Sequence, residues 1–328
     1  DYKSLINPRR LRRMSRMLKM GLFAAKKALT NAKIEIPDAI ITGTGMGCME
    51  DTENFLTAIY ENEEGILSPT PFIQSTHNTV SSSIALHLKC YNYNFTYVHR
   101  GFSFESALLD GMLFCEENEN SDVLVGGIDE IIEPYFQITN RMKMWEGEGV
   151  FAGEGAVFFV LSDNKEKAVA KVLGVKTIFN SESFSKKNLA LEIQNFLSEK
   201  GLKSEDLDII CLGQNGNPLT QSAYDFLIQN LFSKNNLIHF KHLCGEYKTA
   251  SSFGFWLASE ILKNQSVPEF VKLNDFETKN IRNILTINCL STLFNICHPA
   301  SKFRELCQKR RHCQADSSHQ LNKKDLKN

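Results

Sequence analysis

The sequence predicts an α/β fold made of two similar halves. Three short runs are apolar on both faces, as expected of central strands that helices cover on either side: DVLVGG (122–127), AVFFVL (156–161) and DIICL (208–212). Amphipathic helices are predicted over 7–30 and 187–200, where apolar residues recur every three or four positions. The second half of the chain repeats the pattern of the first, so we expect sheets with helices between and outside them.

Composition narrows the class of protein. The chain has 328 residues, is 42% hydrophobic and carries a net charge of −1, which is typical of a soluble globular protein and not of a disordered or polyanion-binding one. No apolar run is long enough for a membrane span, and the polar, basic first residues do not resemble a signal peptide. Nine cysteines without C-x-x-C pairs favour a reducing compartment. We therefore expect a cytoplasmic protein, and the start at Asp1 without Met is consistent with a missing N-terminal segment.

The predicted helix over 7–30 is strongly basic. Its apolar stripe includes Leu11, Leu18, Leu22 and Leu29, and most of its basic side chains lie off that stripe. These basic residues are Arg9, Arg10, Arg12, Arg13, Arg16 and Lys19. The plainest interpretation is a solvated helix face. The alternative is a docking patch for an acidic partner such as an acyl carrier protein, whereas nucleic acid is disfavoured because the whole chain is not basic.

The stretch Thr96–Met112 predicts a strand, a tight turn at Arg100-Gly101 and a helix. Such a turn presents a side chain to a pocket from the N-terminus of a helix. A second glycine-containing strand end, VLVGGIDE (123–130), follows it. The glycine-rich turn in IPDAIITGTGMG (36–47) lacks the lysine of a phosphate loop and the spacing of a dinucleotide fingerprint, so we expect no nucleotide cofactor. We expect no metal either.

The order of these motifs resembles that of the β-ketoacyl synthases of the thiolase superfamily. In that family the strand runs into a catalytic Cys followed by x-Ser-Gly, and Ser103 falls on the family serine. Residues 126–130 fall on the double-glycine turn of the family, and residues 153–156, GEGA, on a later family turn. The resemblance extends over residues 8–296 and rests on five signatures in the family order.

The resemblance implies a thiolase-like, five-layered αβαβα sandwich in which each half has a mixed five-stranded sheet. The expected halves are 1–165, which resembles the N-terminal half of the β-ketoacyl synthases, and 166–300, with residues 301–328 as a polar, disordered tail. We expect the crossover into the second half over 164–178 and a final strand at Ile284–Ile287. No helix is predicted between Glu130 and Gly147.

The resemblance also places unusual residues at the catalytic positions. Gly101, Gly213 and Glu246 stand where the family has its Cys, His and His. Condensation requires a thiolate to carry the acyl chain and donors to stabilise the enolate. Glycine supplies neither, and an ionised glutamate repels an enolate, so no condensation by this chain alone is expected. The residues expected to contact substrate are Phe102, Phe104 and Lys241.

Chain-length factors are ketosynthase-like subunits that lack the nucleophile and shape the tunnel in which a polyketide grows. The resemblance therefore predicts such a subunit of bacterial fatty acid or polyketide biosynthesis, similar also to ketosynthase-like proteins found beside pigment-type polyketide genes. Its expected partners are an active ketosynthase or a second copy of the chain, and an acyl carrier protein. The helix Asn78–Leu88 and the strand Phe95–Val98 are expected at the dimer interface, with Phe95 and Tyr97 partly exposed in the isolated chain.

Two other functions stay open at this point. The first is an acyltransferase or thioester hydrolase in which Ser103 and His77 form a nucleophile–base pair, although Ser103 is usually structural in the family and a lone histidine near a helix start is more often structural too. The second is a non-catalytic, acyl-binding homodimer.

Overall fold

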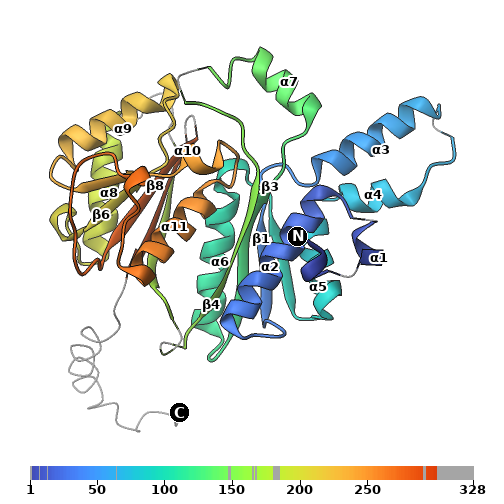
Figure 1. Cartoon of the computed structure of the whole chain (residues 1–328), viewed down its shortest axis with the longest axis horizontal. Helices are drawn as coiled ribbons and strands as arrows, with labels where there is room; N and C mark the ends of the chain where they lie inside the picture. The colour runs from blue at the N-terminus through green and yellow to red at the C-terminus, as the bar shows by residue number, and fades with distance from the viewer. Residues whose placement is uncertain are drawn as a thin grey trace, which may run out of the picture.

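The computed structural model describes residues 2–6, 8–12, 14–63, 65–146, 149–164, 166, 168–179, 185–290 and 293–300. The tail over 301–328, which the sequence predicts to be disordered, lies outside the described residues. Two sheets form the framework, and Figure 1 shows them side by side with helices between and around them.

The first sheet has the strand order β2-β1-β3-β4. Its members are β2 (Tyr93–Tyr97), β1 (Ala39–Gly43), β3 (Asp122–Asp129) and β4 (Gly155–Ser162). The strands β2, β1 and β3 are parallel, and β4 is antiparallel to β3. Every residue of β1 is buried, as is all of β3 after its first residue, which agrees with the apolar runs of the sequence.

The second sheet has the strand order β5-β9-β8-β6-β7. Its members are β5 (Lys171–Phe179), β9 (Leu293–Ala300), β8 (Ile284–Leu290), β6 (Ile209–Leu212) and β7 (Asn236–His239). The strands β7, β6 and β8 are parallel, whereas β9 is antiparallel to both of its neighbours. The two sheets therefore share one arrangement, except that the first has no described strand equivalent to β5 beside β4.

Three sequence predictions about strands were wrong. The described first sheet has four strands and not five. The segment over 164–178 contains β5 and is not only a crossover, and β9 follows the strand that was expected to be the last. Polar residues interrupt the apolar pattern in both missed segments, and the strand state is decided by hydrogen bonds to a distant partner, Lys171–Phe179 against Leu293–Ala300.

Helices cover the outer faces of the sheets. On the first sheet these are α2 (Arg16–Ala32) and α5 (Thr79–Leu88), which pack on β3, β4, β1 and β2. On the second sheet they are α8 (Lys186–Glu199) and α9 (Pro218–Asn230), whose apolar residues share a core with β6 and β8. The predicted helix over 7–30 is divided into a short α1 (Pro8–Leu11) and α2, and α2 buries the predicted stripe.

Two helices fill the space between the sheets. The helix α6 (Ser103–Glu117) packs on β1 and β3 and also reaches β5, while α11 (Ser251–Asn264) packs on β8 and also reaches β4. Figure 1 shows α6 and α11 next to each other in the centre of the molecule. The order of layers is thus helix, sheet, helix, sheet, helix, as the sequence predicted.

The remaining helices lie at the periphery. The pair α3 (Met49–Glu61) and α4 (Pro69–Ser75) forms an arm that projects from the body in Figure 1. The helix α7 (Glu133–Arg141), which was not predicted, stands above the sheets, and α10 (Lys241–Cys244) is a single turn. Four 3-10 turns complete the set: η1 (Tyr2–Ser4), η2 (Arg100–Phe102), η3 (Ser204–Asp206) and η4 (Glu269–Val271). None of the helices in the described part of the chain is both long and apolar enough to span a membrane.

Candidate functional site

The predicted strand–turn–helix is present, but its turn differs in detail. The strand β2 ends at Tyr97, and α6 begins at Ser103. The residue with left-handed backbone is Arg100, with φ of 52°. It precedes Gly101, which is buried. Left-handed backbone is uncommon for a residue other than glycine, so the elbow presents an exposed arginine where the family resemblance suggested a glycine in place of the nucleophile.

Ser103 closes this elbow. Its Oγ accepts a hydrogen bond from the backbone N–H of His99 at 2.8 Å and donates one to the carbonyl of Arg100 at 2.8 Å. The side chain is completely buried. Both bonds are local, which is the usual role of a serine at a helix start.

His77 lies elsewhere, on the protein surface. Its ring contacts Gly47, where an added Cβ would come within 2.8 Å of the His77 Cδ2. Among the described residues no hydrogen bond joins His77 to Ser103. The structure therefore does not assemble the nucleophile–base pair of the hydrolase alternative.

Asp129 fastens the two halves together at the end of β3. Its Oδ1 accepts from the backbone N–H of Gly45 at 2.7 Å and from Thr44 Oγ1 at 3.2 Å. Its Oδ2 accepts from the backbone N–H of Thr249 and from Thr249 Oγ1, both at 2.8 Å. Burial raises the pKa of Asp129, while the four hydrogen bonds lower it. The carboxylate thus holds the loop after β1 against the start of the final helix.

Glu130, the next residue, anchors the arm. Its Oε1 accepts a hydrogen bond at 3.0 Å from the backbone N–H of Glu50 in the first turn of α3. The carboxyl group is only 4% exposed. Burial, together with the negative charges of Glu50 and Asp51, raises its pKa to about 7, although that hydrogen bond and the charge of Arg16 oppose the shift.

We predict that Glu130 makes folding stability depend on pH near neutrality. The folded pKa of Glu130, about 7, exceeds the ordinary value of 4.5. Its contribution to the free energy of unfolding is therefore fully present below pH 4.5, where the group is protonated, and is lost as the pH rises through 7. The loss is on the order of 3 kcal/mol. Urea unfolding between pH 4.5 and 8 should give a flatter profile for Glu130→Gln than for the wild type. The exposed Glu133→Gln should keep the wild-type profile, and an unchanged profile in Glu130→Gln would contradict the prediction.

Lys241 and Glu246 form a buried ion pair. The distance from Lys241 Nζ to Glu246 Oε2 is 2.5 Å, and the lysine side chain is 1% exposed. Asn215 Nδ2 donates to the same oxygen at 2.8 Å. Burial raises the pKa of Glu246, while the charge of Lys241 lowers it. Lys241, expected to contact substrate, is neutralised by Glu246, the residue that the sequence resemblance placed at a family histidine.

Gly213, which the sequence resemblance placed at the other family histidine, faces Asn288. A Cβ added to Gly213 would lie 2.4 Å from Asn288 Oδ1. Asn288 is completely buried, and neither of its amide atoms has a hydrogen-bond partner among the described residues. The amide therefore occupies the space next to Gly213. Sequence reasoning missed Asn288, although a lone asparagine in the apolar strand ILTINCL (284–290) was a visible signal.

A close backbone contact positions Glu246. The backbone N–H of Gly153 donates to the Glu246 carbonyl at 3.0 Å, and the N–H of Glu246 donates to the Phe151 carbonyl at 2.9 Å. A Cβ on Gly153 would lie 2.1 Å from the carbonyl oxygen of Cys244. The glycine of the predicted GEGA turn is thus required because the first half of the chain here touches the second half through backbone atoms.

The two phenylalanines expected to contact substrate occupy different environments. Phe104 is completely buried, and its ring centroid lies 6.0 Å from those of Phe159 and Phe255. It belongs to the hydrophobic core between the sheets and exposes no surface to a ligand in this structure. Phe102 is half-buried at the elbow.

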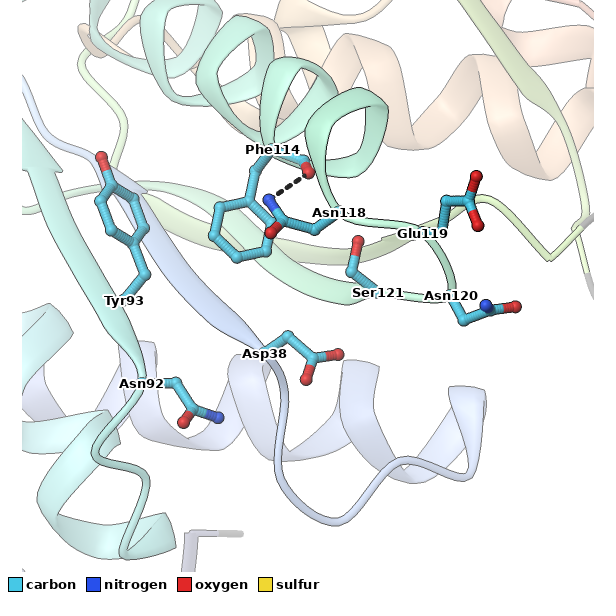
Figure 2. A pocket seen from close by; sticks show the side chains of 8 residues that line it. All are labelled: Asp38, Asn92, Tyr93, Phe114, Asn118, Glu119, Asn120 and Ser121. Atoms are coloured by element: carbon cyan, nitrogen blue, oxygen red, sulfur yellow. Dashed lines mark hydrogen bonds between the residues drawn. The ribbon is translucent and has the colours of Figure 1, made fainter.

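The structure contains an open cavity at the end of the first sheet that lies opposite the elbow. Its volume is about 320 Å³, and it lies where β1, β2 and β3 begin (Figure 2). Its lining is mostly polar: Asp38, Asn92, Tyr93, Phe114, Asn118, Glu119, Asn120 and Ser121. None of the site residues predicted from the sequence lines this cavity. The elbow lies at the opposite ends of these strands.

Solved structures with the same fold include ketosynthase-type proteins. One described as the ishigamide ketosynthase/chain length factor aligns with a TM-score of 0.73 and 18% identity, covering 92% of this chain and 86% of its own. A β-ketoacyl synthase from Burkholderia phymatum STM815 aligns with a TM-score of 0.68 and 12% identity, covering 90% of this chain and 84% of its own. A structure described as a type II polyketide synthase acyl-carrier protein in complex with its ketosynthase bound to the hexaketide aligns with a TM-score of 0.72 and 13% identity. The alignment covers 92% of this chain and 88% of that chain.

The comparison of sequences gives the family. No curated protein matches the chain significantly in sequence. The family described as "Beta-ketoacyl synthase, N-terminal domain" matches residues 3–189, which is more than half of the chain. The chain therefore belongs to the β-ketoacyl synthase family and has its thiolase-like fold.

Proposed function

We propose that the protein is a chain-length-factor-like subunit of bacterial polyketide or fatty acid biosynthesis, which pairs with an active ketosynthase and does not condense acyl groups by itself. The observation that carries this proposal is the state of the three positions that the family uses for catalysis. Gly101 has no side chain, Gly213 is packed against Asn288, and Glu246 is bound to Lys241. The structural similarity to a ketosynthase/chain length factor supports it.

Three of the described thiols are unsuited to replace the missing nucleophile. Burial raises the pKa of Cys211, Cys244 and Cys289 to about 12. The thiolate is the reactive form of cysteine, so these thiols are poor nucleophiles near neutral pH. The Lys241–Glu246 pair also has no free positive charge to stabilise an enolate.

The edge of the first sheet is a suitable interface for the partner. The strand β2 is at the end of the sheet order, so one side of its backbone is unpaired within the described chain. Tyr93, Phe95 and Tyr97 stack along it, with ring centroids 6.3 Å and 4.9 Å apart. Phe95 is 46% exposed and Tyr97 is partly exposed, as predicted from the sequence. An obligate interface of this kind buries about 2,000 Å² or more.

The basic N-terminal helices are the surface we propose for an acyl carrier protein. Arg12 is exposed and Lys19 is half-buried, so part of this positive surface can reach an acidic partner. Arg16 is already engaged, because it contacts Glu154 at 2.9 Å and donates to the carbonyl of Ile131 at 2.5 Å. The patch is therefore smaller than the sequence predicts.

Two further points belong to this proposal. We place the division between the halves near residue 165, because the first sheet ends at Ser162 and the second begins at Lys171. We also propose action in the cytoplasm, which agrees with the free thiols of Cys48, Cys90, Cys115, Cys211, Cys244 and Cys289.

We predict that the purified chain forms a stable complex with the ketosynthase encoded beside it, with a mass equal to one copy of each. Phe95→Asp places a charge in the proposed interface and should weaken the complex at least tenfold. Phe270→Asp changes a phenylalanine that is 66% exposed on another surface, and should leave the complex intact. Mass photometry and sedimentation of the mixtures measure both effects.

The other outcomes separate the alternative functions. A chain that forms only homodimers in the presence of the ketosynthase would support the acyl-binding homodimer. Thioester hydrolysis by the chain alone that disappears in Ser103→Ala would support the hydrolase. Either result would overturn the proposal.

A further inference from the structure

The cavity where β1, β2 and β3 begin is negatively charged (Figure 2). None of the eight residues that line it is Lys, Arg or His, and two of them, Asp38 and Glu119, carry carboxylates, which gives the lining a net charge of −2. The equivalent place in the second sheet, where β6 and β8 begin, has a cavity of about 510 Å³ that is lined also by Lys279 and Arg282. The lack of cations is therefore particular to the first cavity and is not shared by the two halves.

Hydrogen bonds fix which atoms of two asparagines in this cavity are left for a ligand. Asn92 Nδ2 donates to the carbonyl of Pro37 at 2.9 Å. Asn118 Nδ2 donates to the carbonyl of Phe114 at 2.9 Å, along the dashed line in Figure 2. A carbonyl accepts and does not donate, so each amide must turn its nitrogen toward the backbone. The amide oxygens of both asparagines are therefore left as acceptors.

Asp38 and Ser121 add further oxygen atoms. Asp38 Oδ2 accepts from the backbone N–H of Asp122 at 2.8 Å, which leaves Oδ1 for a ligand. The Ser121 side chain is only 4% exposed and lies near the thiol of Cys115. Its hydroxyl has no hydrogen-bond partner of normal geometry among the described residues, and a buried hydroxyl in that state is destabilising. The lining thus offers mainly acceptors and is complementary to a ligand that donates.

The negative potential extends behind the lining. Burial chiefly raises the pKa of the Cys115 thiol, and the charges of Asp163, Asp122 and Asp38 raise it further, against the opposite effect of the Ser121 hydroxyl. These carboxylates therefore act together on this end of the sheet, and a cation placed there is attracted by all of them.

Two aromatic rings form the apolar wall of the cavity. The ring centroids of Tyr93 and Phe114 lie 5.6 Å apart, with an angle of 33° between the planes. Tyr93 is 43% exposed and Phe114 is half-buried. The face of an aromatic ring attracts an ammonium group, and it also packs against methylene groups. Calcium, by contrast, requires about six to eight oxygen ligands and gains nothing from a ring, so the wall favours an organic cation over a metal ion.

We propose that this cavity binds a small aliphatic amine in its ammonium form. The ammonium group has three donors and no acceptor, which complements the carboxylate of Asp38 and the amide oxygens of Asn92 and Asn118. The methylene groups of the ligand pack on Tyr93 and Phe114. A volume of about 320 Å³ is at the lower end of the range for ligand pockets, about 300–1,000 Å³, and suits a ligand of a few carbon atoms. The inference goes beyond the proposed function, because the elbow lies at the opposite ends of the strands.

Isothermal titration with 1,4-diaminobutane tests the inference, with 1,4-butanediol and calcium chloride as the other probes. The wild type should bind the diamine, and the diol, which has the same length and no charge, should bind at least tenfold more weakly. Asp38→Asn should weaken binding of the diamine at least fivefold, while its amide oxygen can still accept from Asp122. The control Glu116→Gln removes an exposed carboxylate of α6 that does not line the cavity, and should bind as the wild type does. The chain is titrated without a partner, because Tyr93 also belongs to the edge proposed for the ketosynthase.

A second measurement locates the ligand without a variant. The diamine should slow exchange of the amide hydrogens over residues 114–122 of the wild type, as measured by hydrogen exchange and mass spectrometry, and the diol should not. Exchange over 201–208 and 279–283, at the second cavity, should stay unchanged. Equal binding of diol and diamine, tighter binding of calcium, undiminished binding by Asp38→Asn, or protection only at the second cavity would each overturn the inference.

Discussion

Lys241→Met is expected to lower the free energy of unfolding by about 3–5 kcal/mol, the usual cost of removing one partner from a buried ion pair. Lys241 is 1% exposed, and its ammonium lies 2.5 Å from Glu246. Without it the carboxylate keeps only the hydrogen bond from Asn215, at 2.8 Å. Its other oxygen is buried and has no partner in the described part of the chain. Urea unfolding followed by circular dichroism measures the loss.

Two further variants show whether the buried charge is the cause. Lys241→Met/Glu246→Gln should recover most of the lost stability, because the neutral amide does not require a counter-ion. Lys143→Met removes an exposed pair with Glu146, at 3.2 Å, and should change stability by less than about 1 kcal/mol. A loss of less than about 1 kcal/mol in Lys241→Met itself would show that Glu246 is not held as a buried ion.

Gly101→Cys should not turn the chain into a working ketosynthase. The variant places a thiol where the sequence resemblance expects the family nucleophile, but Gly213 and Glu246 still stand where it expects the family histidines. Each missing donor costs about 10²–10³ in rate, so condensation should stay about 10⁴-fold or more below that of the partner ketosynthase. Malonyl decarboxylation and acyl condensation, measured for the variant alone and with that partner, check the expectation. Condensation by the variant alone at a rate near that of the partner would contradict it.

Adding the histidine at position 213 should also fail unless Asn288 is changed. A Cβ at Gly213 would lie 2.4 Å from Asn288 Oδ1, and overpacking of this kind costs about 1–3 kcal/mol. Gly213→His should therefore unfold at lower urea than the wild type, and Gly213→His/Asn288→Ala should recover part of the loss. Asn288→Ala alone is the matched control. Full stability of Gly213→His by itself would show that the amide moves away easily.

The elements that the sequence located correctly have strong local signals. The elbow over Thr96–Met112, the buried strands β3 and β6 and the amphipathic α2 all follow from apolar patterning within a few turns of chain. The GEGA turn that contains Gly153 was also located from the sequence. Its first residue must lack a side chain, because the carbonyl of Cys244 approaches it closely. The helix α7, which was missed, stands away from the body, and Thr139 is its one buried residue, so no core-facing stripe marks it in the sequence.

The site could be predicted only in outline. The sequence placed Gly101, Gly213 and Glu246 at the family positions through the order of motifs alone. It did not reveal the pairing of Glu246 with Lys241 or the amide of Asn288 beside Gly213. These depend on which side chains fill the space left by a glycine.

The sequence by itself therefore determined the family and the layered α/β architecture, because these are written in local patterns and in residue identity. Only the tertiary structure decided which strands complete the sheets, that Ser103 closes a turn, and that Glu246 pairs with Lys241. It also brought Asp129 of the first half against Thr249 of the second, and no pattern of neighbouring residues encodes such a contact.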